Sequence, residues 1–324
     1  MAGGLYHRCA LDAAGAAYCW GVNDQGRLGD GTTTARTSPV PVSGGVVFVS
    51  LTAGATHTCG LDTAGHAWCW GNNGRSALGD GTTEVEQHVP VPVAAPTGGS
   101  PLTFSLLTAG WIHTCGLGTD GVAWCWGDNT EGELGNLTPL GSNRPTRVAG
   151  GRLFRALSAE ALHTCALASD GAAYCWGKND EGELGTGTTT ASATPVAVAG
   201  GFRYTAIAAS GLDGPDSHTC AATTTGMGCW GDNTAGQLGD GTTTDRLTPS
   251  VVAGTVFERL AGGLQFTCGL TSAGTAWCWG TNPRGELGNG TTTSQSSPSD
   301  SRPKATEPSA GSSCSTSCSS PSPP

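Results

Sequence analysis

The sequence predicts an all-β protein, a β-propeller built from four-stranded antiparallel blades. The main observation is a pattern that recurs six times with single-residue variations: H-x-C-x-L, a short turn, C-W-G, and then L-G. The glycines of C-W-G lie 50, 56, 50, 54 and 49 residues apart, a spacing typical of one stacked supersecondary unit. No stretch of ten or more residues shows the apolar periodicity of a helix.

Two segments of each copy predict a β-hairpin. In the second copy they are residues 57–61 and 67–71, joined by Asp62-Thr63-Ala64-Gly65. Asp62 opens this turn, and Gly65 supplies the positive φ that a type I turn with a glycine bulge requires.

Two further segments complete each blade. Residues 48–53 precede the hairpin of the second copy, and the prolines of residues 39–42 confine that segment to a sheet edge. Four short strands in each unit of about fifty residues are typical of a propeller blade. Trp68 and Trp70 share one face of their strand, so we expect the C-W-G tryptophans to be buried between stacked blades.

The propeller is expected to span residues 1–300, followed by a disordered Ser- and Pro-rich tail at 301–324. Because the sequence opens inside a repeat, the first blade is expected to lack the strand equivalent to residues 48–53. We expect an array that is incomplete at both ends. Whether the blades close into a ring is not decided by the sequence. The approximate repeats are 1–46, 47–102, 103–152, 153–201, 202–255 and 256–300.

Twelve of the fourteen cysteines fall into pairs. If Asp62 pairs with His66 across the bulged turn, Cys59 lies directly opposite Cys69, at a separation that suits a disulfide. The fifth pair is one residue closer, and a turn one residue tighter restores direct opposition. The sequence predicts six cross-strand disulfides: Cys9–Cys19, Cys59–Cys69, Cys115–Cys125, Cys165–Cys175, Cys220–Cys229 and Cys268–Cys278.

Two alternatives to disulfides remain open. Buried free thiols could fill the interface between blades. His57, Cys59 and Cys69 could supply three zinc ligands, but Phe266 replaces the histidine in the sixth copy and no fourth ligand recurs. We therefore expect no metal, and we expect the recurrent histidine to bond to backbone at the inner blade edge.

The motifs A-G-x-x-H-x-C-x-L, C-W-G-x-N and G-x-L-G-x-G-T resemble the regulator of chromosome condensation repeat, over roughly residues 1–298. This resemblance implies a propeller, usually of seven blades, and here one of bacterial type. The family includes guanine nucleotide exchange factors, chromatin binders, photoreceptors and a secreted bacterial inhibitor, so the fold alone does not choose the function.

Composition and motifs narrow the function classes. A formal net charge of -10 disfavours nucleic-acid binding, and no apolar run is long enough for a membrane helix. The sequence has no nucleophile elbow, phosphate loop or zinc-protease motif. We therefore expect no enzyme activity, no cofactor and no membrane insertion. Paired cysteines favour an extracellular or cell-surface location, with the cytoplasm as the alternative.

Two function hypotheses follow. The first is a non-catalytic module, secreted or surface-displayed and monomeric, that binds an unknown protein or glycan. The alternative is a regulator of a small GTPase that resembles a guanine nucleotide exchange factor. Such a factor works in a reducing compartment, where twelve paired cysteines would be unusual.

Two places are candidate binding sites. The insert at residues 210–217 breaks the repeat period, and inserted propeller loops often carry recognition. Its candidate contact residues are Leu212, Asp213, Pro215 and Asp216. Two acidic loops after neighbouring C-W-G strands form a candidate acidic rim for a cation or a basic partner, although neither has calcium-loop spacing. The residues of this rim are Glu131, Glu133, Asp180, Glu181 and Glu183.

Overall fold

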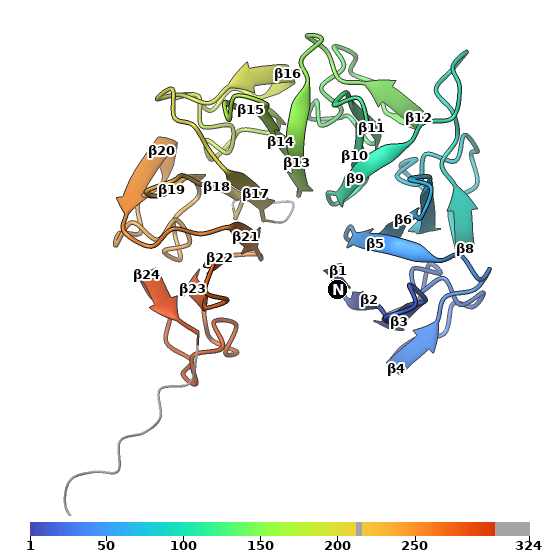
Figure 1. Ribbon diagram of the computed structural model, residues 1–324, viewed down its shortest axis with the longest axis horizontal. Coiled ribbons are helices and arrows are strands. Elements are labelled where there is room, and N and C mark those ends of the chain that lie inside the picture. Colours follow the sequence, from blue (N-terminus) through green and yellow to red (C-terminus); the bar gives the residue numbers. More distant parts are fainter. Residues whose placement is uncertain (212–215, 302–324) are drawn as a thin grey trace, which may run out of the picture.

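In the computed structural model, residues 1–211 and 216–301 are described, and they form six four-stranded antiparallel sheets. Each sheet is one blade, and the blades stand around a central space (Figure 1). The six blades form an arc that leaves an opening between the first and the last (Figure 1). The all-β propeller fold is confirmed.

The strands follow one another along the chain from the inner to the outer edge of each blade. The first three blades comprise β1 (Ala2–Gly3), β2 (His7–Leu11), β3 (Ala17–Gly21) and β4 (Arg36–Pro41); β5 (Phe48–Ala53), β6 (His57–Asp62), β7 (Ala67–Asn72) and β8 (Glu86–Pro92); and β9 (Phe104–Ala109), β10 (His113–Gly118), β11 (Ala123–Gly127) and β12 (Ser142–Arg147). The last three comprise β13 (Phe154–Glu160), β14 (His163–Ala168), β15 (Ala173–Gly177) and β16 (Ser192–Ala197); β17 (Ala206–Ser210), β18 (His218–Ala222), β19 (Gly226–Gly231) and β20 (Arg246–Ala253); and β21 (Arg259–Gly262), β22 (Phe266–Leu270), β23 (Ala276–Gly280) and β24 (Gln295–Asp300).

The hairpin turn sets the register of the two central strands. The Asp62 amide donates to the His66 carbonyl at 3.0 Å, and the Asp62 carboxylate accepts from the amides of Ala64 and His66. This pairing places Cys59 opposite Cys69, as predicted. In the fifth blade the turn is tighter, and Cys220 and Cys229 are again directly opposed. Disulfide bonds join all six predicted pairs.

The blade edges differ from the prediction at one end. The proline-containing strands, such as β4, lie at the outer edge of their sheets, where a missing amide breaks no ladder. The prediction that the first blade lacks its innermost strand is wrong, because β1 pairs with β2 through Ala2 and Cys9. Ala2 and Gly3 are enough to form this strand, because they pair with Cys9 and Arg8 of β2.

The core consists of five clusters, each of which joins two successive blades. Between the first two blades, Phe48 and Trp70 pack against Cys9, Cys19 and Leu28. The tryptophans at the equivalent of Trp70 in blades two to six are 0 % exposed, as predicted: Trp70, Trp126, Trp176, Trp230 and Trp279. Trp20 is only half-buried because the described chain places no blade before it.

An asparagine in every blade organises the loop between the third and fourth strands. In the first blade the Asn23 side-chain oxygen accepts from the Leu28 amide at 2.9 Å, and its amide group donates to the carbonyls of Thr32 and Thr34. The same residue recurs in C-W-G-x-N as Asn73, Asn129, Asn179, Asn233 and Asn282. The recurring motif is therefore a scaffold.

Across the described ranges, no helix is long and apolar enough to cross a membrane.

Candidate functional site

A hydrogen-bonded joint connects each blade to the next. Between the third and fourth blades, Thr164 Oγ1 and Trp176 Nε1 both donate to the Glu133 carbonyl, at 3.2 and 2.8 Å. His113 Nε2 lies 2.9 Å from Thr164 Oγ1. Because the hydroxyl proton of Thr164 is committed to the carbonyl, His113 must donate from Nε2. The joint thus fixes the neutral tautomer with its proton on Nε2.

The same joint links all six blades. Burial lowers the pKa of these histidines, to about 4 for His113 and about 3 for His57, because a buried imidazolium loses its hydration. The expectation that the recurrent histidine bonds to backbone is wrong; the side chain reaches the threonine of the following blade, since that hydroxyl stands between it and the carbonyl. The His–Thr pairs are His7–Thr58, His57–Thr114, His113–Thr164, His163–Thr219 and His218–Thr267.

The His–Thr pair of the joint is incomplete at both ends of the array. Arg8 occupies the position of the threonine in the first blade, and Phe266 that of the histidine in the sixth. The Arg8 guanidinium donates instead to the His7 carbonyl at 2.8 Å. Each end blade therefore lacks one side chain of this joint, although the first blade keeps the tryptophan, Trp20.

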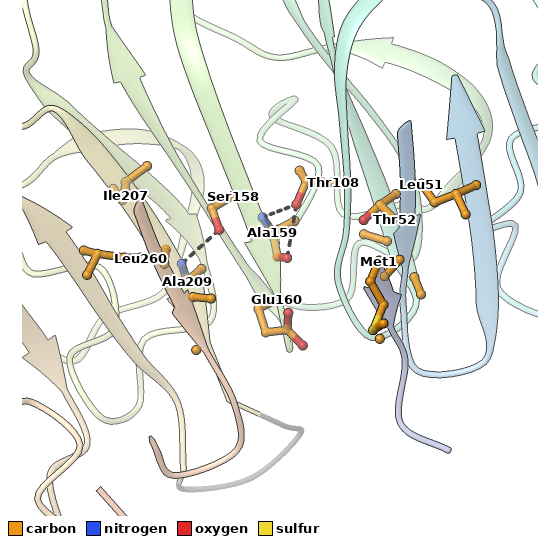
Figure 2. Close-up of a pocket in the computed structure, with 17 residues that line it drawn as sticks. Met1, Leu51, Thr52, Thr108, Ser158, Ala159, Glu160, Ile207, Ala209 and Leu260 are labelled. Atoms are coloured by element: carbon orange, nitrogen blue, oxygen red, sulfur yellow. Dashed lines mark hydrogen bonds between the residues drawn. The ribbon is translucent and has the colours of Figure 1, made fainter. Parts of the chain in front are cut away.

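The innermost strands surround a central cavity of about 260 Å³. Polar side chains connect these strands from blade to blade: the Ala159 amide donates to Thr108 Oγ1 at 2.9 Å, and the Ala209 amide to Ser158 Oγ at 3.0 Å (Figure 2). Most of the lining is apolar or backbone. Glu160, at the end of β13, is the only charged side chain of the lining, and it projects into the central space (Figure 2).

A larger cavity, of about 680 Å³, adjoins the central one. It extends to the opening between the first and sixth blades, where Arg8 and Phe266 line it. Trp111 and Glu160 line its side toward the third and fourth blades, and Glu160 borders both cavities. Arg8 and Phe266, which replace the threonine and the histidine of the joint, thus line the same cavity. This larger cavity is the candidate site.

Comparison with known proteins identifies the family that has this architecture. The sequence matches the RCC1-like domain over residues 1–319. The chain belongs to the RCC1-like domain family. This assignment agrees with the resemblance seen in the repeat motifs.

Solved structures share the RCC1-like propeller fold. Human WBSCR16 superimposes with a TM-score of 0.81 at 19 % identity, over 93 % of this chain and 80 % of that one. Prp20p from Saccharomyces cerevisiae gives 0.74 at 21 % identity, over 94 % and 77 %. The ectodomain of the Arabidopsis thaliana receptor kinase ACR4 gives 0.53 at 20 % identity, over 86 % and 77 %. At these identities the likeness concerns the fold alone.

The RCC1-like propeller does not gather the sequence-predicted site residues in one place. Leu212, Asp213 and Pro215 lie outside the described residues. Asp216 accepts a hydrogen bond from the Gln265 side-chain amide of the sixth blade at 2.6 Å. This part of the insert therefore links the fifth and sixth blades beside the larger cavity, which Gln265 also lines.

The five carboxylates of the predicted acidic rim divide into two groups. Glu131 and Asp180 are exposed and Glu181 is half-buried, whereas Glu133 and Glu183 are 0 % exposed. In both buried groups Oε2 accepts from the backbone amide two residues earlier, and Oε1 is buried without a partner. Burial raises both pKa values to about 7. These two carboxyls lie inside the blade and are unavailable to a partner.

Sequence reasoning missed Glu160. The signal was present, because Ala-Glu-x-x-His in the fourth copy replaces the Ala-Gly-x-x-His of the second and third copies. Over residues 1–211 and 216–301 the structure places no three His, Cys, Asp or Glu side chains where they could hold a metal ion.

Proposed function

We propose that this RCC1-like propeller is a non-catalytic protein-binding module that works in an oxidising compartment, secreted or displayed on a cell surface. The observation that carries the proposal is the disulfide in every blade. Structural disulfides persist outside the reducing cytosol. The recurring motif residues serve the hairpins, loops and joints of the scaffold, which leaves recognition to the cavity and the exposed loops.

The structural neighbours are compatible with such a role. ACR4 presents this fold in the ectodomain of a receptor kinase. Prp20p, which has binding properties toward Gsp1p and histones, supports the alternative of a GTPase regulator. Six disulfides weigh against that alternative, because a small GTPase is met in a reducing compartment.

Counting thiols separates the two. In natively purified protein we expect at most two titratable thiols, those of Cys314 and Cys318, and an intact mass about two units lower for each bridged pair. Purification from an oxidising and a reducing expression compartment provides the matched comparison. Twelve or more free thiols in both preparations would contradict the oxidised module and favour the intracellular regulator.

Capture of a partner tests the binding role itself. We propose the accessible acidic side chains of the rim, the exposed Glu131 and Asp180 and the half-buried Glu181, as contacts for a basic protein surface, since acidic patches attract such partners and speed association. The triple Gln variant should capture less of any partner found by cross-linking while its melting temperature is unchanged. Equal capture would remove the rim from the binding surface.

A further inference from the structure

We propose that the cavity beside Trp111 and Glu160 binds an organic cation, the guanidinium or ammonium group of a basic side chain. This inference rests on the proposed binding function, because it names the chemistry of the group that a partner would insert. The argument depends on one unpartnered carboxylate, one aromatic ring outside the repeat pattern, and the cavity that both residues line.

Glu160 is a carboxylate without a counterpart. It stands where the second and third blades have Gly54 and Gly110, it is half-buried, and its carboxyl group makes no hydrogen bond or ion pair within the described part of the chain. Burial raises its pKa to about 8, so near pH 7 the empty cavity favours the protonated carboxyl, and a bound cation would favour the ionised form. A carboxylate taken out of water without a partner is costly, and a cation in the cavity would remove that cost.

The backbone of the fourth blade is shaped to present this side chain. β13 runs one residue further than β9, so that Glu160 pairs with His163 inside the ladder. Ala161 then turns the chain with a φ of 44°, in the left-handed region that favours glycine. Glycine at position 160 would leave the inner end of the cavity without an acidic group, so Glu160 changes what the cavity can bind.

Trp111 provides the aromatic wall. Its amide donates to the Ala161 carbonyl at 3.0 Å, which holds the Trp111 loop next to the end of β13. It is half-buried, lies outside the C-W-G motifs and lines the same cavity as Glu160. A carboxyl group and an indole ring that line one cavity are the two groups that recognise guanidinium and ammonium ions.

Charge across the cavity gives the ligand a direction. Arg8, Arg284 and Glu286 line it from the first and sixth blades, across the central space from the third and fourth blades that carry Trp111 and Glu160 (Figure 1). The side at the opening thus carries two guanidinium groups and one carboxyl, whereas Glu160 is the acidic group at the inner end. With a formal net charge of -10, the whole chain attracts a basic group.

Titration of the whole chain with small cations tests the site. The probes are ethylguanidinium chloride and the peptide acetyl-Gly-Arg-Gly-amide, with sodium chloride and acetyl-Gly-Gln-Gly-amide as controls at equal ionic strength. The readout is the Trp111 indole N–H resonance of nitrogen-15-labelled protein, assigned with Trp111→Phe. We expect a saturable shift with both cationic probes and none with the controls. Tighter binding of the peptide would indicate a protein segment as the source, and equal binding a free cation.

Matched variants assign the contacts. Glu160→Gln and Glu160→Gly should weaken binding at least about tenfold, because a charge-assisted hydrogen bond is lost. Trp111→Leu should weaken binding about threefold. Because this variant lacks the indole resonance, its binding is monitored through the backbone amide resonances of residues 160–162. Glu84→Gln, an exposed carboxylate outside the cavity, should have no effect. All variants are checked for an unchanged melting temperature.

Two results would overturn the site. One is the absence of a saturable shift with either cation; the other is equal affinity in wild type and both Glu160 variants. Neither result bears on the thiol count. A partner captured equally by wild type and Glu160→Gln would preserve the proposed binding function while removing this site from it.

Discussion

At the scale of single residues, one backbone carbonyl organises each joint between blades. The Glu133 carbonyl accepts from both Thr164 and Trp176, so both of its lone pairs are used. His113 adds a third donor, directed at the threonine hydroxyl. Each of these side chains is buried, so loss of one partner leaves another without a hydrogen bond and away from water.

Removal of the threonine hydroxyl should therefore destabilise the fold. Thr164→Val leaves the His113 N–H and the Glu133 carbonyl each short of a partner, and we expect a loss of about 1–3 kcal/mol in urea unfolding. Thr164→Ser keeps the hydroxyl and should recover most of it. Thr83→Val, at an exposed threonine, serves as the control. A loss for Thr164→Val no larger than that for Thr83→Val would refute the role of the joint.

The buried histidines and glutamates give the stability opposite slopes with pH. Folded His113 has a pKa lowered from 6.5 to about 4, so the unfolded chain binds protons first and stability falls as the pH drops below about 6.5. Folded Glu133 has a pKa raised from 4.5 to about 7, so the folded chain binds the proton and stability falls as the pH rises from 4.5 through 7.

Replacement of Glu133 by a neutral residue should remove the loss of folding stability at higher pH. The precedent is Gln237, which occupies the same repeat position and donates to Asp232. Glu133→Gln can donate in the same way to Asp128, and we expect a gain of roughly 1–3 kcal/mol at pH 8 and little at pH 5. Denaturant unfolding at both pH values measures it.

Glu183 provides the matched comparison. Burial raises both pKa values to about 7, but Lys178 of the fourth blade occupies the repeat position of Asp128, so a glutamine at position 183 has no carboxylate there to donate to. Glu183→Gln should therefore gain less at pH 8 than Glu133→Gln. Equal gains, or a gain at pH 5 as large as at pH 8, would contradict the assignment of the slope to these carboxyls.

At the scale of elements, each blade is a disulfide-linked hairpin to which one strand is added on each side. The bridges of the first five blades are 0 % exposed because the following blade covers them. In the sixth blade Cys278 is 6 % exposed and Cys268 is half-buried, since no described blade follows. Access to the sulfurs therefore differs along the array.

Reduction under native conditions should follow this difference. Attack by a thiol needs access to sulfur, so Cys268–Cys278 should open first when the folded protein is treated with dithiothreitol. Differential alkylation and peptide mass spectrometry would give the order. Simultaneous reduction of all six bridges would show that global unfolding, and not exposure, controls access. Earlier reduction of Cys165–Cys175 would contradict the burial described here.

The hairpins show how far sequence alone could reach. The turn Asp62–Gly65 fixes the register by local chemistry, so the opposition of Cys59 and Cys69 could be counted out from it. The partner of the recurrent histidine could not be predicted in this way, because Thr114 lies 57 residues from His57 and the two side chains meet only when the blades stack. Glu160 was missed for a related reason, since its surroundings come from several blades at once.

At the scale of the whole molecule, the blades form a one-dimensional array in which each contacts its neighbours. The innermost strands touch in sequence order, and the end blades each lack one neighbour in the described chain. Stability in such arrays is close to a sum of unit and interface contributions. The end blades should therefore open more readily than the interior ones.

Hydrogen exchange would reveal this gradient. We expect amides of β22 in the sixth blade to exchange at least about tenfold faster than those of β14 in the fourth, because one missing interface lowers the local opening free energy. Deuterium uptake by peptide over time measures it, with β18 as the intermediate case. Uniform protection across all six blades would indicate a single cooperative unit.

The joint described between blades is directional, and this makes the blades modular. Each interior blade offers a histidine and a carbonyl on one side and a threonine and a tryptophan on the other. Deletion of residues 103–152 would place His57 against Thr164 and the Ala77 carbonyl against Trp176, a complete joint. We expect the shortened chain to fold and to melt in a single transition by circular dichroism, whereas a deletion of half a blade should not fold. The number of blades can then vary by whole units while every remaining junction keeps its chemistry.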